Sequence, residues 1–381
     1  MAGTRQVDFE TAARAALSES KAAEILRQYQ QGFGRPIIST EFQGHRVVAV
    51  GKTVKWSAAW RYFTDFLLDH LKDVIGRPWA IQAQREGKDH PIFVWLSTMN
   101  QVAQSYVGSS PHSYRTSGKG HFGAIWRLGY ALYLIAHNDQ LDAKIITRLR
   151  SPISFRATYH ETQIAAAFAV TGFKISMAEV RCTAGKTPEF WATSSSGKRF
   201  SVEAKCKDAW KSNLDPHGQE FKAELRQWIR DQLYKCSLKV LPNAVYCLEL
   251  SLPVDWPPEI WTPLADEIRG FIKEAENIRV KGAEPKEAYV IVTNNVDVLE
   301  HQEFAVNRIA MLTAFNMRDW YENGESVESE AAFDSHEKHR EMHKIFKTFE
   351  EIDEIPQSFD GSYRYSMRAV SHLRSNFVLV G

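Results

Sequence analysis

The stretch FSVEAKCK, residues 200–207, has the composition of a β-strand and carries an acid and a base on the same face. Side chains alternate between the two faces of a strand, so Phe200 and Val202 point one way while Glu203 and Lys205 point the other, about two residue rises (~6.6 Å) apart. Such a pair is either an ordinary ion pair on an exposed sheet face or a metal ligand beside a lysine that orients water.

A second acid precedes this strand in the sequence TPEFWA, residues 187–192. The segment TSSSGKR, residues 193–199, is small, polar and contains a glycine, which predicts a hairpin loop between two short strands. The hairpin would place Glu189 beside Glu203 on the neighbouring strand.

A third acid lies in an apolar helix predicted over residues 157–171 and containing YHETQIAAAFAV. Glu161 precedes Ile164, Ala165 and Phe168 by three, four and seven residues, so all four share one helix face. A buried carboxylate costs several kcal/mol unless it is paired or binds a metal. Glu161 is therefore interpreted either as a salt-bridged core residue or as a third ligand at the same site.

Three converging carboxylates would form a site of hard oxygen ligands. Mg²⁺ or Mn²⁺ prefers such ligands and keeps several waters. The ion would lower the pKa of a bound water and neutralise charge on a phosphoryl oxygen. Lys205 would position the attacking water or stabilise developing negative charge.

This pattern resembles the PD-(D/E)XK, or restriction-endonuclease-like, nuclease superfamily. The matching residues are Glu161 on a helix, Pro188-Glu189, and Glu203-Ala204-Lys205 on a strand. A helix predicted over 219–239 and the apolar strand at 244–252 continue the resemblance, and Gln232 matches a glutamine that several such families place near the site. Glu189 departs from the family pattern, in which aspartate is usual, and reaches one methylene further.

The resemblance implies an α/β fold with a mixed sheet flanked by helices. It also implies a Mg²⁺- (or Mn²⁺-) dependent nuclease that acts on phosphodiester bonds, with DNA as the expected nucleic acid. Its metal ligands would be Glu161, Glu189, Glu203 and the Ala204 carbonyl, and Lys205 and Gln232 would complete the catalytic set. By analogy with other proteins of this fold, a restriction or phage-defence role is expected. The alternative is an inactive subunit that keeps the fold and binds nucleic acid or scaffolds a complex.

Three parts are expected along the chain. Residues 1–150 would form a mainly helical accessory domain with a small β-hairpin, residues 151–300 the nuclease-like domain, and residues 301–381 a helical extension that packs on the core. Helices are predicted over 8–31, 57–75, 89–106, 121–137, 262–279, 302–316 and 335–352, and further strands over 36–42, 45–56, 286–295 and 376–381. The accessory domain would bind substrate, a protein partner or a second copy of the chain.

The composition narrows the class of protein. The chain has 381 residues, 44% of them hydrophobic, and a formal net charge of +1, so any nucleic-acid contact must be a local basic patch. Its four cysteines form no CxxC motif, and Cys182, Cys206 and Cys247 lie in or near apolar strands, as core thiols do. No secretory segment or membrane span is predicted. The expected location is the cytoplasm.

Three other motifs have weaker interpretations. The GKT at residues 51–53 lacks the first glycine of a phosphate-binding loop, because position 46 is Arg46.

His339 and His343 are four residues apart on a predicted helix that also carries His336. These histidines form either a charged helix face or the zinc site of a hydrolase. The glycine-rich loop 108–123 contains basic residues that either contact phosphates or form an ordinary surface loop.

Overall fold

The computed structural model describes most of the chain. The described residues are 18–19, 21–28, 31–87, 89–105, 120–139, 141–177, 187–239, 241–253, 256–295, 308–321, 329–351, 355–361 and 377–380. Residues 108–119 of the basic loop predicted over 108–123, Cys182 and most of the helix predicted over 8–31 lie outside these ranges. Residues 120–123 of that loop are helical, as are residues 21–28 of the predicted helix.

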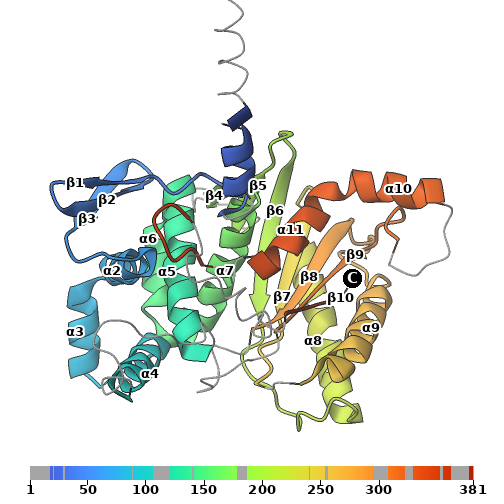
Figure 1. Cartoon of the computed structure of the whole chain (residues 1–381). Coiled ribbons are helices and arrows are strands. Elements are labelled where there is room, and N and C mark those ends of the chain that lie inside the picture. The colour runs from blue at the N-terminus through green and yellow to red at the C-terminus, as the bar shows by residue number, and fades with distance from the viewer. Residues whose placement is uncertain are drawn as a thin grey trace, which may run out of the picture.

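A seven-stranded mixed sheet forms the centre of the molecule (Figure 1), with the order β10-β9-β8-β7-β6-β5-β4. The strands β6, β7 and β8 run parallel to one another, as do β9 and β10, and the remaining neighbours are antiparallel. The strands are β4 (Lys174–Met177), β5 (Phe190–Thr193), β6 (Arg199–Cys206), β7 (Ala244–Glu249), β8 (Ala288–Asn294), β9 (Arg308–Phe315) and β10 (Phe377–Val380).

Helices cover both faces of this sheet. The helix α7 (Pro152–Val170) and the helix α11 (Arg340–Glu351) pack on one face, with α5 (Gly120–Asn138) behind α7. The helices α8 (Gln219–Ser237) and α9 (Pro258–Ala275) cover the other face. Strands β7 and β8 are buried on both faces, which explains why their sequences are continuous apolar runs rather than alternating ones. The fold is therefore α/β, with a mixed sheet flanked by helices, as the sequence predicts.

The helix α7 lies between the sheet and the N-terminal helices. It begins after Ser151, in extended conformation, with a proline in its first turn, and it ends at Gly172, whose φ is +92°. Every side chain from Tyr159 to Val170 is buried, as expected for a helix surrounded by protein on all sides. A glutamate within such a helix must therefore meet the sheet or another helix rather than water.

Residues before α7 form a helical layer and a small separate sheet. The sheet contains β1 (Ser39–Phe42), β2 (His45–Val50) and β3 (Thr53–Ser57), all antiparallel. The helices are α2 (Phe63–Ile75), α3 (Arg77–Arg85), α4 (Pro91–Ser105), α5 and α6 (Ala143–Leu149). One buried apolar cluster joins Val48 and Phe63 of this region to Phe168 and Val245, so it continues across the boundary expected near Pro152. The three-part division of the chain stays a prediction.

Two predictions of secondary structure are wrong. Residues 308–315 form strand β9, which pairs with β8 and β10, whereas a helix was predicted over 302–316. Short apolar runs do not distinguish a buried strand from a buried helix, and the partners that decide the matter are distant in sequence. The single strand predicted over 45–56 is two strands, because Gly51, with φ +59°, turns the chain between β2 and β3.

The remaining differences concern short elements and the division of one helix. The sequence analysis does not predict the short helices α3 and α6 or the edge strand β4. The C-terminal helix predicted over 335–352 is divided into α10 (Ser329–Lys338) and α11 near His339. The described residues contain no helix with the length and apolar character needed to cross a membrane.

A turn at Gly32 brings two backbone N–H groups to the C-terminal end of α7. The backbone N–H groups of Phe33 and Gly34 donate to the Val170 carbonyl, which would otherwise lack a partner at the helix end. Gly32 has φ +72°, and a Cβ there would lie 2.4 Å from Val170 Cγ1 and 2.6 Å from the Val170 oxygen.

We expect Gly32→Ala to lower the free energy of unfolding by about 2–4 kcal/mol, from the backbone strain and the steric clash together. Gly44→Ala is the matched control, since Gly44 has φ +75° with nothing within 4 Å of its would-be Cβ. That variant should cost only about 1 kcal/mol of strain. Urea unfolding of both variants checks this, and equal losses would show that the contact with Val170 is unimportant.

Candidate functional site

The hairpin of β5 and β6 places the two predicted carboxylates side by side. Phe190 pairs with Val202, so the register brings the preceding residue, Glu189, opposite Glu203. The Glu189 N–H donates to the Val202 carbonyl at 3.0 Å, which extends the ladder by one residue beyond the strand. Opposite residues of an antiparallel pair project from the same face, so both carboxylates lie on one side of the sheet.

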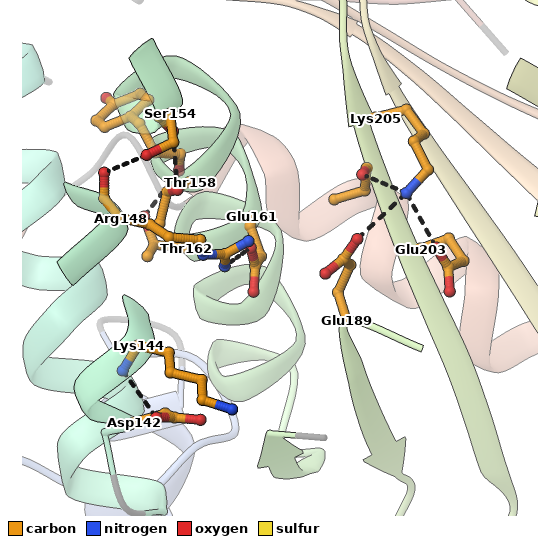
Figure 2. Close-up of polar contacts among 12 residues, drawn as sticks. Asp142, Lys144, Arg148, Ser154, Thr158, Glu161, Thr162, Glu189, Glu203 and Lys205 are labelled. Carbon is orange, nitrogen blue, oxygen red and sulfur yellow. Dashed lines mark hydrogen bonds and ion pairs between the residues drawn. The ribbon is translucent and has the colours of Figure 1, made fainter. Parts of the chain in front are cut away.

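The ammonium group of Lys205 lies among three oxygens (Figure 2). Its Nζ is 3.2 Å from Glu189 Oε1, 3.0 Å from Glu203 Oε2 and 3.2 Å from the Ala204 carbonyl oxygen. These three oxygens belong to residues that would be metal ligands if the resemblance to PD-(D/E)XK nucleases holds. The protein therefore already holds one cation, its own lysine, where they converge.

Lys205 carries a positive charge near neutral pH. Burial by itself would lower the pKa of the Lys205 ammonium, but the negative charges of Glu203 and Glu189 outweigh burial and raise the pKa above its ordinary value. The neighbouring thiol of Cys236 has its pKa raised by burial to about 12. Near neutral pH the lysine is thus protonated and the thiol is uncharged.

A second lysine, which the sequence did not indicate, binds the other oxygen of Glu203. Lys239, two residues beyond the end of α8, donates to Glu203 Oε1 at 2.6 Å and to the Thr187 carbonyl at 2.9 Å. The Glu203 side chain is only 1% exposed. Its buried carboxylate therefore depends on two ammonium groups, one from its own strand and one from α8. No local pattern signals Lys239, because the contact spans 36 residues.

The third predicted acid approaches from α7. Glu161 is buried, forms an ion pair with Arg148 through its Oε2 atom, and faces the strand that carries Lys205 in Figure 2. Burial raises the pKa of Glu161 to about 7, and the charge of Glu189 contributes in the same direction, while Arg148 and Lys205 oppose the shift. A carboxyl group in this environment exchanges a proton near neutral pH.

The structure leaves Gln232 outside this set of contacts. It lies half-buried on α8 and makes no hydrogen bond to the three acids or to Lys205 among the described residues. The residue that reaches the site from this part of the chain is Lys239. The catalytic role of Gln232 stays a prediction.

The donor chemistry fits a hard divalent cation. The convergent atoms are all oxygens, and Lys205 marks a point within 3.2 Å of three of them. With the side chains in these positions, the described residues contain no cluster of three or more His, Cys, Asp or Glu residues arranged to hold a metal ion. Binding an ion between Glu189 and Glu203 therefore requires the Lys205 ammonium to leave their oxygens.

A second buried polar pair lies next to Glu161 in sequence. His160 Nδ1 is 3.9 Å from Glu249 Oε2, and its Nε2 is 3.4 Å from the Cys247 carbonyl. Burial lowers the pKa of His160 to about 4. Burial also raises the pKa of Glu249, although that carboxyl accepts hydrogen bonds from Thr293 and Asn295. The Nε2 contact joins α7 to β7, whereas Nδ1 is buried without a hydrogen-bond partner among the described residues.

The C-terminal histidines are occupied by other contacts. His339 Nδ1 lies 2.8 Å from the Tyr289 hydroxyl, and the ring of His343 stacks on His336 and Trp320 with centroids 4.7 and 5.0 Å apart. Parallel stacked rings direct their nitrogens alongside one another instead of toward a common point. This arrangement favours a packing role over the zinc site.

No family model matches the chain, and no curated protein or solved structure shows a significant match to it.

The raised pKa of Glu161 predicts a specific dependence of stability on pH. Between pH 4.5 and 7 the folded protein holds a proton on Glu161 that the unfolded chain releases, so stability falls as pH rises through this window and is greatest below it. Relative to Glu161→Gln, the wild-type protein should lose up to about 3 kcal/mol between pH 4.5 and 8. Urea unfolding of both proteins across this range is the measurement. Parallel curves would show that the pKa of Glu161 is ordinary.

Proposed function

We propose that this protein is a metal-dependent nuclease with a restriction-endonuclease-like fold, acting on DNA. The observation that carries the proposal is the convergence of the Glu189, Glu203 and Ala204 oxygens on a single cationic group. Here two carboxylates and a carbonyl meet at one point, and the charges of Glu189 and Lys205 also act on the buried carboxyl group of Glu161 on α7.

Glu189, Glu203 and the Ala204 carbonyl would hold Mg²⁺ or Mn²⁺, with Glu161 reaching the ion directly or through a water. The bound ion would supply charge neutralisation at a phosphoryl oxygen and lower the pKa of a water. These ligands come from one hairpin, so the rigid sheet would set their spacing.

The remaining groups have roles that follow from their charge. Lys205 remains an ammonium near neutral pH, so it would donate a hydrogen bond to the attacking water or to a phosphate oxygen as negative charge develops. The Oε1 atom of Glu161, whose Oε2 is held by Arg148, would accept the proton that the water loses. Attack by the water oxygen forms a new P–O bond, the opposite P–O bond breaks, and solvent protonates the leaving oxygen.

The architecture supports this assignment at the level of fold. A helix carrying an acid precedes an antiparallel hairpin carrying the other two, and a helix and a parallel strand follow. This order is the one that the resemblance to PD-(D/E)XK nucleases implies. A role in restriction or phage defence follows from that analogy alone.

One observation favours a second candidate, an inactive nuclease-fold subunit that binds nucleic acid or acts as a scaffold. Both oxygens of Glu203 are engaged by lysines, and Glu161 is engaged by Arg148. A site whose carboxylates are neutralised by the protein's own cations has less need of a metal. The two candidates differ in whether an added divalent ion displaces the ammonium.

Cleavage assays provide the direct test. Circular and linear DNA, single- and double-stranded, would be incubated with Mg²⁺, Mn²⁺ or EDTA. We expect cleavage with either metal, none with EDTA, and a loss of at least about 100-fold in Lys205→Ala and Glu203→Gln. Lys222→Ala is the control, because Lys222 is a partly exposed lysine on α8 paired with Glu267. Equal activity in all variants, or cleavage in EDTA, would contradict the proposed site.

Metal affinity supplies a second test that does not depend on turnover. Because the Lys205 ammonium competes for the same oxygens as the ion, Lys205→Met should bind Mn²⁺ at least about tenfold more tightly than the wild type. Electron paramagnetic resonance measures the free Mn²⁺ directly. In Glu203→Gln/Lys205→Met this gain should disappear. Failure of every variant to bind Mn²⁺ would favour the inactive subunit.

A further inference from the structure

The small N-terminal sheet has one buried face and one exposed face. Val48 and Val50 of β2 point inward and join the main core, whereas the alternate residues of all three strands point outward. The outward residues are Ile38, Thr40 and Phe42 along β1, His45, Val47 and Ala49 along β2, and Val54 and Trp56 along β3. In Figure 1 this sheet lies at the edge of the molecule, beyond α2.

This outward face is strongly apolar for a surface. Trp56 is 66% exposed and Phe42 is 63% exposed, and Ile38 and Val54 are each more than half exposed. Tryptophan and phenylalanine normally bury most of their area, so this degree of exposure on one flat face indicates a binding surface. The face contains no acid.

The rings on this face form a track across the strands. Phe42 pairs directly with His45, and Val47, two residues further along β2, pairs with Trp56. Directly opposite side chains lie about 5 Å apart and diagonal ones about 7–8 Å, so Phe42, His45 and Trp56 follow one another at spacings that successive unstacked bases can span. Three π-faces in sequence on a sheet are the arrangement on which proteins stack single-stranded nucleic acids.

The surrounding charge is basic. Residues 35–62 contain five Lys or Arg residues and one acid, Glu41, although the whole chain has a net charge of only +1. Glu41 pairs with Arg46, and Lys55 pairs with Asp73. Lys52, in the β2–β3 turn, and Arg61 are exposed and form no ion pair with another described residue. They are available to phosphates.

We propose that the outward face of β1–β3 binds single-stranded nucleic acid, with bases stacked on Phe42, His45 and Trp56 and the backbone held by cations that include Lys52. A basic rim favours this occupant over a second copy of the chain, because a two-fold contact would bring like charges together. The lysine of the GKT motif thus contacts phosphate as an exposed side chain on a hairpin turn, not within a nucleotide-binding loop.

This surface is separate from the carboxylate site. The elements between them are α5, which contacts β2, and α7, which contacts both α5 and β6. Binding at the sheet therefore needs neither metal nor Lys205, and it stands whether or not the protein cleaves its ligand.

The test measures binding of a fluorescein-labelled, mixed-sequence 12-nucleotide DNA by anisotropy in EDTA, with the RNA of the same sequence and the duplex as further arms. We expect binding of one or both single strands, and weaker binding of the duplex. Trp56→Ala and Phe42→Ala should each weaken single-strand binding roughly tenfold, since each removes one stacking partner. Trp56→Phe keeps a ring and should lose less than about threefold.

Three controls separate stacking from other effects. Tyr234→Ala removes an exposed ring on α8 and should leave affinity unchanged. Lys52→Ala should reduce the slope of log affinity against log salt by about 0.7, the value for one phosphate contact to a single strand. Lys222→Ala removes a partly exposed lysine on α8 that is paired with Glu267, and it should bind as the wild type does.

Several outcomes would overturn the proposal. They are no binding of any single strand by the wild type, equal binding by wild type, Trp56→Ala and Phe42→Ala, and equal loss in Tyr234→Ala. A wild-type dimer in sedimentation that Trp56→Ala dissociates, with oligonucleotide binding unchanged, would instead assign the face to self-association.

Discussion

The buried carboxylate of Glu203 is the constraint on which the site depends. A carboxylate removed from water is stable only if its charge is compensated, and here two ammonium groups, from Lys205 and Lys239, contact its two oxygens. Because Lys239 follows α8 and Lys205 lies on β6, this compensation also fixes α8 against the sheet. The same lysine that neutralises Glu203 brings Glu189 to the point where a metal ion would be held.

The position of α7 follows from a related requirement. This helix is buried on all sides and carries consecutive polar residues, His160 and Glu161, against the sheet. Glu161 pairs with Arg148 on α6, and His160 Nε2 contacts the Cys247 carbonyl on β7. Burial raises the pKa of Glu161 to about 7, which suits a group that exchanges a proton beside a phosphodiester. The contacts that hold Glu161 in place thus also set the pKa that the proposed reaction would use.

The two surfaces that we assign to nucleic acid differ in physical character. The carboxylate site is partly buried and made of oxygens and ammonium groups, so it favours a metal ion and a phosphate. The outward face of β1–β3 is flat, exposed and aromatic, so it favours unpaired bases. A chain with almost no net charge cannot attract nucleic acid by its overall field, and a local stacking surface with a basic rim provides affinity without it.

The sequence by itself determined the elements whose patterns are local. Alternation along β6, the polar loop before it and the apolar pattern around Glu161 predicted the hairpin, the helix and the grouping of Glu189, Glu203 and Lys205. The place of Glu161 in the same site stays a prediction. Tertiary structure alone decided the pairing of Lys239 with Glu203, the pairing of Arg148 with Glu161, and the identity of β9, because each depends on partners distant in the chain. It also decided which face of β1–β3 meets the core, since the strand pattern places apolar residues on both faces and only packing against the helical layer distinguishes them.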